Sequence, residues 1–187
     1  MKERPRSYRA IVCDVDGTIT DPQRLIQCLG IETLRQVQAS GFTVMLASGN
    51  VLPVTYGLST FIGLTGPVIA ENGGMVAYQD RIYKLHSAET AERAYDHISK
   101  NLPGTKRLFT DNWRQSEVGL KRSNDLNRIR ELLEGWDIEV EATGFSIHLM
   151  EKGHSKVSGI RKACELLSMT MDDVVAIGDA DNDVKML

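Results

Sequence analysis

The sequence contains few cysteines, no long apolar run and little net charge. No apolar stretch approaches the roughly 20 residues that a membrane-spanning helix requires. Met1–Arg9 is polar and basic, and it lacks the apolar segment of a secretory signal. None of the three cysteines belongs to a C-x-x-C pair, which argues against a disulfide framework and against a zinc site. These absences predict a cytoplasmic protein with reduced thiols and no membrane partner.

The charge balance argues against a nucleic-acid-binding protein. A net charge of −3 over 187 residues gives no sign of the basic surface that binds nucleic acids. The excess acidic residues are concentrated in two short segments, around Asp14 and around Asp179, as expected of a divalent-metal site. We therefore expect a small-molecule partner and no nucleic acid, and we leave a homodimer open.

The first apolar run, Ala10–Cys13, ends abruptly at two carboxylates, Asp14 and Asp16. Because side chains alternate along a strand, these two carboxylates point the same way. Like charges at that spacing repel unless a cation or a shared proton neutralises them. Gly17 then permits a turn that a side chain would exclude, and Thr18 offers a hydroxyl to hold it. A strand followed by an ordinary turn would explain this segment in isolation, so its meaning depends on the rest of the chain.

Three further apolar runs are typical of strands buried on both faces: Phe42–Ala47, Pro67–Ala70 and Val174–Ile177. Helical patterns lie between the strands, over Ile31–Ala39 and from Pro53 onward. This alternation predicts an α/β fold with a doubly wound parallel sheet and right-handed crossovers. Such a sheet normally continues beyond its last strand, so either this edge is short or the sequence is a piece of a longer one.

Between residues 81 and 152 the pattern changes to short strands and two amphipathic helices. Met75–Tyr78 and Arg81–Leu85 read as a hairpin, and further strand-like stretches are Arg107–Thr110, Glu117–Lys121, Ile138–Glu141 and Ser146–Met150. Strands that neighbour strands indicate a small α+β unit rather than more parallel sheet. We expect a catalytic core formed by residues 1–80 and 153–187, with residues 81–152 inserted as a cap.

A short polar segment follows every predicted core strand. In open α/β sheets, ligands bind at this carboxyl edge. We therefore expect these residues to converge there, together with Lys156 from the helix that precedes the last strand. The polar residues are Asp14 and Asp16; Ser48 and Asn50; Glu71 and Asn72; and Asp179, Asn182 and Asp183.

This set of groups suits phosphoryl transfer through a covalent aspartyl-phosphate. A carboxylate nucleophile that attacks a phosphate dianion meets charge repulsion. A divalent cation between Asp14, Asp179 and the phosphate would remove that repulsion. Asp16 could protonate the leaving oxygen and later activate water.

The remaining polar groups suit the phosphate itself. The ammonium of Lys156 and the hydroxyl of Ser48 can hold phosphoryl oxygens, and glycines such as Gly49 let backbone amides approach the anion. Taken singly, Lys156 also reads as a solvated residue at a helix start, and Ser48 as the cap of a turn. The completeness of the set favours the phosphate-binding interpretation of both.

These segments resemble the four motifs of the haloacid dehalogenase superfamily of phosphatases. The motifs are Asp14-x-Asp16-Gly17-Thr18, Ser48 at the end of the second strand, Gly153-x-x-Lys156, and Gly178-Asp179-x-x-Asn182-Asp183. The insert resembles the C2-type cap of the family. With Glu71–Gly74 before it and Ser146-x-His148 near its end, the chain is similar to the archaeal-type phosphoglycolate phosphatases of the Cof-like branch.

The resemblance implies a Rossmann-like core that carries this cap, and it assigns roles to the motif residues. Asp14 would be the nucleophile, and Asp16 the general acid and base that also offers its backbone carbonyl to Mg²⁺. Asp179 and Asp183 would complete the magnesium site, while Lys156 and Asn182, with Ser48 and Gly49, would bind substrate. Asn50 departs from the pattern, because members often have arginine there.

Several other residues carry weaker expectations. His148 is at least as well explained as a structural histidine, Asp181 as a solvated carboxylate, and Trp113 and Trp136 as packing residues. The cap cations are more simply read as a solvated surface than as a wall facing an anionic substrate. These cations are Lys106, Arg107, Arg114, Lys121 and Arg122.

The leading hypothesis is a Mg²⁺-dependent phosphomonoesterase for a small anionic metabolite, and the resemblance favours 2-phosphoglycolate. A sugar-phosphate phosphatase or a phosphotransferase with the same intermediate is an alternative. A phospho-receiver signalling domain groups similar residues, but it carries its acceptor after a middle strand and needs no such insert. An inactive binding homologue is disfavoured by the intact motif set.

Overall fold

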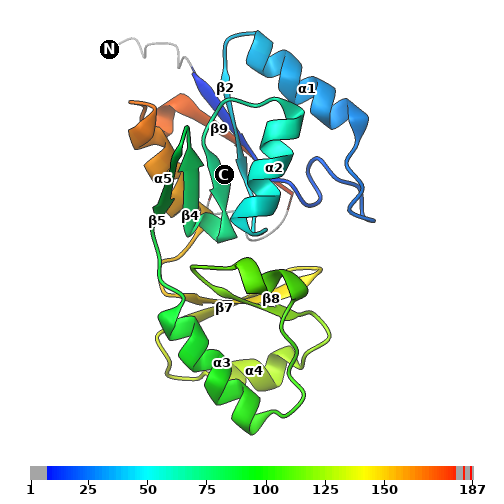
Figure 1. The fold of residues 1–187 in the computed structure, drawn as a ribbon, viewed down its shortest axis with the longest axis vertical. Coiled ribbons are helices and arrows are strands. Elements are labelled where there is room, and N and C mark those ends of the chain that lie inside the picture. Colours follow the sequence, from blue (N-terminus) through cyan, green and yellow to red (C-terminus); the bar gives the residue numbers. More distant parts are fainter. Residues whose placement is uncertain (1–7, 180–182, 184–185, 187) are drawn as a thin grey trace, which may run out of the picture.

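The computed structural model describes residues 8–179, 183 and 186, and its larger unit is a six-stranded sheet (Figure 1). The strand order is β5-β4-β3-β2-β1-β9, in which β9, β1, β2 and β3 are parallel and β4 and β5 form an antiparallel hairpin. The strands are β1 (Ala10–Cys13), β2 (Thr43–Ala47), β3 (Val68–Ala70), β4 (Met75–Tyr78), β5 (Arg81–Lys84) and β9 (Val174–Ile177). The predicted parallel sheet is therefore confirmed.

Helices cover both faces of this sheet. They are α1 (Cys28–Ala39) and α2 (Leu52–Ile62) on one face and α5 (Lys156–Leu166) on the other. Alternate residues of β2 serve the two layers: Val44 and Leu46 pack with α1 and α2, whereas Met45 packs with α5. Pro53 lies in the first turn of α2, where its missing N–H is not needed. This three-layer arrangement brings the carboxyl ends of four parallel strands to one edge.

Strand β9 is less buried than its apolar sequence predicts. Its first three residues are half-buried, and Ile177 is 41% exposed. Within the described residues β9 pairs with β1 alone, so it has a neighbour on one side only. The expectation of burial on both faces was wrong for this strand because burial depends on neighbours as well as on composition.

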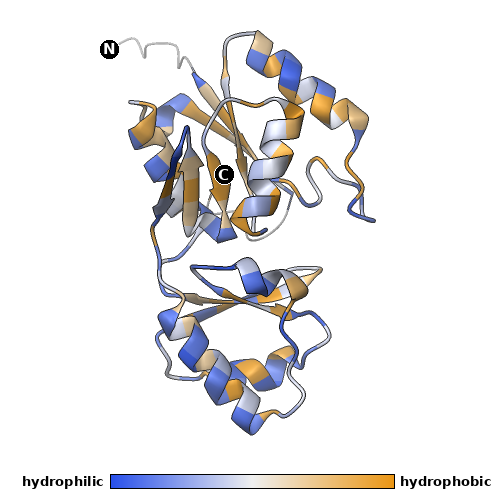
Figure 2. Cartoon of the chain, in the orientation of Figure 1, coloured by the Kyte–Doolittle hydropathy of each residue, from blue (hydrophilic) through white to orange (hydrophobic). Residues whose placement is uncertain are grey.

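The second unit is a three-stranded antiparallel sheet in the order β6-β8-β7. Its strands are β6 (Val118–Lys121), β7 (Ile138–Ala142) and β8 (Ser146–Glu151), and its helices are α3 (Glu89–Asn101) and α4 (Leu126–Leu132). Apolar side chains of α3 and α4, such as Ile98 and Ile129, pack on Leu120 and Ile147 to form its core. Figure 2 shows hydrophobic residues on the strands and hydrophilic ones on the outer helical faces. The opposite face of the sheet is turned toward the larger unit.

Two details of this unit differ from expectation. The second half of strand-like Arg107–Thr110 belongs to a 3₁₀ helix over Phe109–Trp113, and Arg107 forms an isolated bridge to Leu120. Trp113 is 46% exposed and packs edge-on against Phe109 outside the cap core, whereas Trp136 packs against that core as expected.

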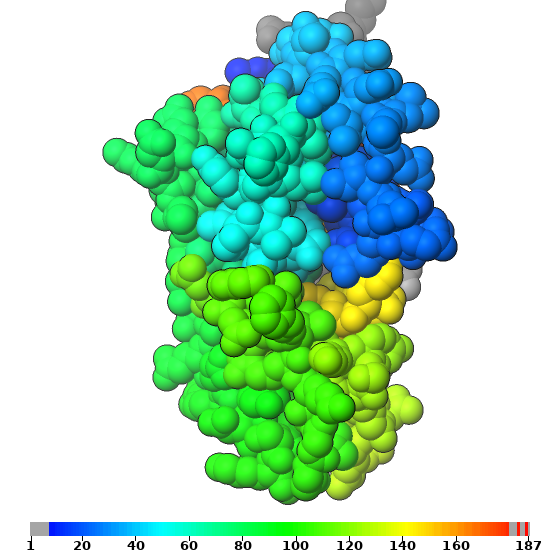
Figure 3. All heavy atoms as spheres, turned by 45° about the vertical axis from the view of Figure 1, so that its right-hand side comes forward, coloured from blue at the N-terminus to red at the C-terminus, as the bar shows by residue number. Residues whose placement is uncertain are grey.

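The expected boundary at residue 81 falls on β5, which pairs with β4 in the larger sheet. We propose that the inserted cap begins after β5 and ends before α5. The two linkers meet where the imidazole rings of His86 and His154 stack with centroids 4.4 Å apart. Figure 3 shows the cap, in green and yellow, packed against the core in blue and cyan. Among the described residues, no helix combines the length and apolarity needed to cross a bilayer.

Candidate active site

The turn after β1 depends on a glycine. Gly17 has a φ of +92°, and its N–H donates to Thr20 Oγ1 at 2.9 Å. A Cβ on Gly17 would collide with the carboxylate of Asp179. The Thr18 hydroxyl, expected to hold the turn, instead donates to Asp179 Oδ1 at 3.0 Å. Gly17 thus lets the β1 loop approach the loop after β9, from the other end of the chain.

Three carboxylates come together at this edge of the sheet. One oxygen from each of Asp14, Asp179 and Asp183 lies within 4.8 Å of the others. Lys156, the first residue of α5, inserts between them: its Nζ donates to Asp14 Oδ1 at 2.5 Å and to Asp183 Oδ1 at 2.6 Å. The predicted convergence of these four residues is therefore present.

Burial dominates the electrostatics of this cluster. It raises the pKa of Asp14 to about 6, with a further upward contribution from Asp183, although Lys156 opposes the shift. Burial also disfavours the Lys156 ammonium, but the two carboxylates outweigh it and hold the pKa of Lys156 above its ordinary value. Among the residues that the structure describes, Lys156 pairs with Asp14 and Asp183, and the three carboxylates converge on one point. The cluster is therefore a set of hard oxygen donors, which fits a divalent cation.

The carboxylate of Asp16 is held by one residue of its own loop and one of the loop after β2. Its Oδ1 accepts from Arg24 Nε at 2.8 Å, and its Oδ2 accepts from Asn50 Nδ2 at 2.6 Å. Asn50, where the resemblance led us to expect arginine, therefore contacts Asp16 directly. Sequence reasoning missed Arg24, which lies in a polar loop without any periodic or spacing signal.

Of the two residues after β2 that were predicted to bind substrate, only one lines the cavity. Gly49 lines the cavity described below. Ser48 is 1% exposed, and its Oγ accepts from the backbone and side-chain nitrogens of Asn50, both at 3.0 Å. In this structure Ser48 caps the turn and does not line the cavity, so its phosphate contact stays a prediction. Asn182 and Asp181 lie outside the described residues.

A cavity of about 1000 Å³ lies between the core and the cap. Two of the cap cations expected to be solvated, Arg114 and Lys121, line it. The side chain of Arg114 is only 3% exposed, so the interpretation as a solvated surface was wrong for this residue. Among the lining residues, the core contributes Asp14, Asp16, Asp21, Asp179, Arg24, Asn50 and Lys156, and the cap contributes Phe109, Arg114, Lys121, Thr143, Phe145, Ser146 and His148.

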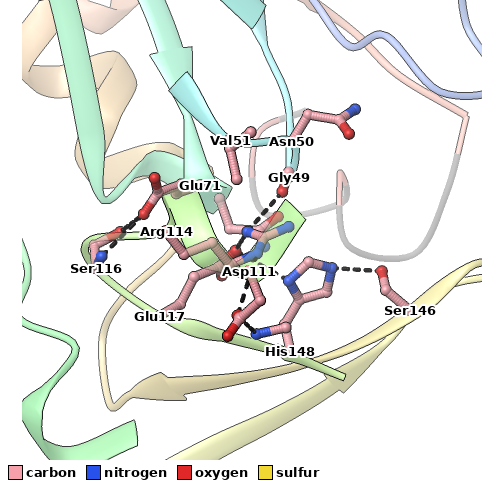
Figure 4. Close-up of polar contacts among 12 residues, drawn as sticks. Gly49, Asn50, Val51, Glu71, Asp111, Arg114, Ser116, Glu117, Ser146 and His148 are labelled. Atoms are coloured by element: carbon pink, nitrogen blue, oxygen red, sulfur yellow. Dashed lines mark hydrogen bonds and ion pairs between the residues drawn. The ribbon is translucent and has the colours of Figure 1, made fainter. Parts of the chain in front are cut away.

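Arg114 belongs to a buried network that joins the cap to the core (Figure 4). Its Nη1 donates to the carboxylate of Glu117 and, at 3.0 Å, to the carbonyl of Gly49. Asn72, in the turn after β3, donates to Glu117 Oε2 at 2.9 Å. The carboxylate of Glu71 in the same turn accepts from the N–H and the hydroxyl of cap residue Ser116, at 2.9 and 2.8 Å. The cap is thus held on the core by buried, hydrogen-bonded charges.

His148 extends this network along β8. Burial, with help from Arg114, lowers the pKa of His148 to about 3, so its ring is neutral. Its Nδ1 lies 3.0 Å from Glu117 Oε1 and its Nε2 lies 2.7 Å from Ser146 Oγ. Because a carboxylate can only accept, we assign the ring proton to Nδ1, which leaves Nε2 to accept from Ser146. Both ring nitrogens have partners, as the structural interpretation of His148 requires.

Carboxylates at the ends of the core strands, a lysine paired with them and a cap over the site together define a known class of protein. A family model for haloacid dehalogenase-like hydrolases matches residues 11–115 and 119–187, and the chain belongs to this family. Its relatives include phosphoglycolate phosphatases from Methanothermobacter thermautotrophicus, 38% identical over 96% of this chain and 80% of the relative, and from Thermoplasma acidophilum, 37% identical over 95% and 80%.

Solved structures share this fold. The crystal structure of Thermoplasma acidophilum 0175 matches with a TM-score of 0.89 and 36% identity, over 96% of this chain and 80% of that one. The sugar phosphatase BT4131 of subclass IIB matches with a TM-score of 0.76 over 96% of this chain and 84% of that one. At 15% identity, the second match shows a common fold alone.

Proposed function

We propose that this chain is a Mg²⁺-dependent phosphomonoester hydrolase that forms an aspartyl-phosphate at Asp14 and acts on 2-phosphoglycolate. One observation carries the catalytic part: Lys156 bridges Asp14 and Asp183 beside Asp179, at the wall of a cavity. The substrate follows from the relatives named phosphoglycolate phosphatase, which are 31–38% identical to this chain.

The metal would be held by the carboxylates of Asp14, Asp179 and Asp183 and by the backbone carbonyl of Asp16. The fit rests on the donor chemistry, because one oxygen from each of the three carboxylates lies within 4.8 Å of the others. When bound, Mg²⁺ supplies positive charge that offsets repulsion between the nucleophile and the phosphate.

In the first half-reaction an oxygen of Asp14 forms a bond to phosphorus while the bond from phosphorus to the ester oxygen breaks. Asp16 gives a proton to that oxygen, so that glycolate leaves as a hydroxy acid. Lys156, already within hydrogen-bond distance of Asp14, holds the phosphoryl group against it. In the second half-reaction a water attacks phosphorus, Asp16 takes its proton, and phosphate and free Asp14 are released.

The size of the cavity favours a second candidate. About 1000 Å³ is far more than a two-carbon substrate fills, and it would admit a sugar phosphate. Phosphate release from a panel containing 2-phosphoglycolate and several sugar phosphates separates the candidates by their kcat/KM values. Recovery of the phosphate on an added alcohol instead of in water would identify a phosphotransferase.

The test of the mechanism is Asp14→Asn, assayed for phosphate release with Mg²⁺ present. Removing a nucleophile costs about 10³-fold or more in kcat, whereas Asp137→Asn, at an exposed cap residue, leaves the rate unchanged. Turnover retained in Asp14→Asn would exclude the covalent intermediate. Asp16→Asn should slow both half-reactions while its carbonyl still supports metal binding, and a fully active variant would remove its acid and base role.

A further inference from the structure

The loop between β1 and α1 contains a small hairpin, and Arg24 at its turn is one of the residues that line the cavity. Its ends are tied by hydrogen bonds from Asp21 N to Leu25 O at 3.0 Å and from Arg24 N to Asp21 O at 2.8 Å. The carboxylate of Asp21 also accepts from the N–H groups of Gln23, at 2.9 Å, and Leu25, at 2.8 Å. The position of Arg24 is therefore fixed by the turn.

Arg24 adopts a left-handed backbone conformation, with a φ of +65°. For a residue with a Cβ this conformation costs about 1–2 kcal/mol, and glycine or asparagine would occupy it more easily. Strain of this kind persists where the surrounding structure holds it, and it clusters at functional sites. The strain at Arg24 therefore points to a functional role for its guanidinium.

The guanidinium lies between the catalytic loop and the cap. Its Nε donates to Asp16 Oδ1 at 2.8 Å, and its Nη2 lies 3.5 Å from Asn50 Oδ1. The ring of cap residue Phe145 covers its plane, 4.8 Å from the ring centroid. Figure 3 shows the early blue segment against the yellow cap strand. No residue that the structure describes accepts a hydrogen bond from Arg24 Nη1, so part of the guanidinium edge faces the cavity.

The other cationic side chains that line the cavity are paired with carboxylates or lie on the cap sheet. Lys156 is bound to Asp14 and Asp183. Arg114 is enclosed by Glu117, Asp111 and the Gly49 carbonyl. Lys121 lies on the cap sheet, paired across the strands with Ser146. Arg24 is the cation in direct contact with Asp16.

On the proposed function, Asp16 protonates the ester oxygen of the substrate. In 2-phosphoglycolate the carboxylate carbon is two bonds from that oxygen, so the carboxylate must lie within a few ångström of Asp16. We propose that Arg24 is a substrate-binding residue that recognises this carboxylate, and that Phe145 holds its guanidinium plane when the cap is closed. This inference rests on the proposed function and gives it a substrate class: phosphomonoesters with a carboxylate next to the ester oxygen. A guanidinium edge matches a carboxylate through paired hydrogen bonds.

The test compares kcat/KM for 2-phosphoglycolate with kcat/KM for 2-hydroxyethyl phosphate, an analogue that carries a neutral hydroxymethyl group in place of the carboxylate. Arg24→Asn removes the cation and keeps a residue that tolerates the left-handed turn. In this variant the ratio of kcat/KM for 2-phosphoglycolate to kcat/KM for 2-hydroxyethyl phosphate should fall about 10- to 100-fold, because a charged hydrogen-bonded pair is lost. Arg24→Lys should retain part of the preference. Arg128→Asn, at an exposed residue of α4, should leave both values unchanged.

The outcomes separate the two proposals. An equal loss on both substrates in Arg24→Asn would show that Arg24 acts through Asp16, and an unchanged ratio would show that it does not read the carboxylate; either overturns the inference. Wild-type enzyme that cleaves both esters equally well would also overturn it while leaving a phosphatase. Release of phosphate from neither ester would overturn the proposed function itself. Thermal unfolding of each variant establishes that it is folded.

Discussion

Two clusters of charge lie on either side of the cavity, and they differ in arrangement. At the edge of the core sheet, Lys156 pairs with Asp14 and Asp183, and Asp179 lies beside them. In the cap, Glu117, Asp111 and Glu92 pair with Arg114 and Arg107. Both clusters use hydrogen-bonded ion pairs, but among the described residues only the first brings three carboxylates to one point. The difference indicates that the core cluster is built to receive a cation, while the cap cluster holds elements together.

Among the proposed variants, Lys156→Gln should have the largest effect on stability. Removing the ammonium takes the paired cation away from the buried carboxylate of Asp14, which costs about 3–5 kcal/mol in the free energy of unfolding. Mg²⁺ should restore part of this loss, because its charge replaces that of the lysine. The measurement is urea unfolding with and without Mg²⁺. Unaltered stability, or no response to Mg²⁺, would contradict a cation site at the core cluster.

Glu117→Gln is the corresponding change in the cap. It removes the carboxylate that accepts from Arg114 and Asn72, and we expect a loss of about 3 kcal/mol because the guanidinium stays buried. Mg²⁺ should restore none of it. Glu131→Gln, in an exposed pair with Arg128, is the matched control and should change stability by less than about 1 kcal/mol. If Mg²⁺ rescued Glu117→Gln, the two clusters would not be separate.

A smaller loss of stability should appear as the pH is lowered. The pKa of His148 is lowered from 6.5 to about 3 in the folded protein, so the unfolded chain binds more protons between these values. The contribution of His148 to the free energy of unfolding is fully present above the pKa of the unfolded state. It is lost as pH falls, by about 2 kcal/mol between about pH 7 and about pH 5. His148→Asn should show a shallower loss over the same interval. An identical pH dependence in the variant would mean that His148 is not buried as a neutral ring.

The sequence was sufficient to predict the strands of the core sheet and the convergence of their carboxyl ends. Apolar runs located β1, β2 and β3, and the parallel topology placed Asp14 and Asp179 at one edge. Burial of Arg114 could not be predicted in this way, since its partners come from the cap strand start and from the Gly49 loop. Arg24 was missed for a similar reason: a hairpin turn directs it to Asp16, and no residue spacing encodes that contact.

The central claim is that residues from opposite ends of the chain form one cation site at which Asp14 is phosphorylated. The most direct measurement is rapid acid quenching during turnover of 2-phosphoglycolate with Mg²⁺, followed by mass spectrometry of the peptides. The account predicts one added phosphoryl group on the peptide containing Asp14, which is absent when Mg²⁺ is chelated or when the variant is Asp179→Asn. A phosphoryl group on another residue, or steady turnover without any labelled peptide, would contradict it.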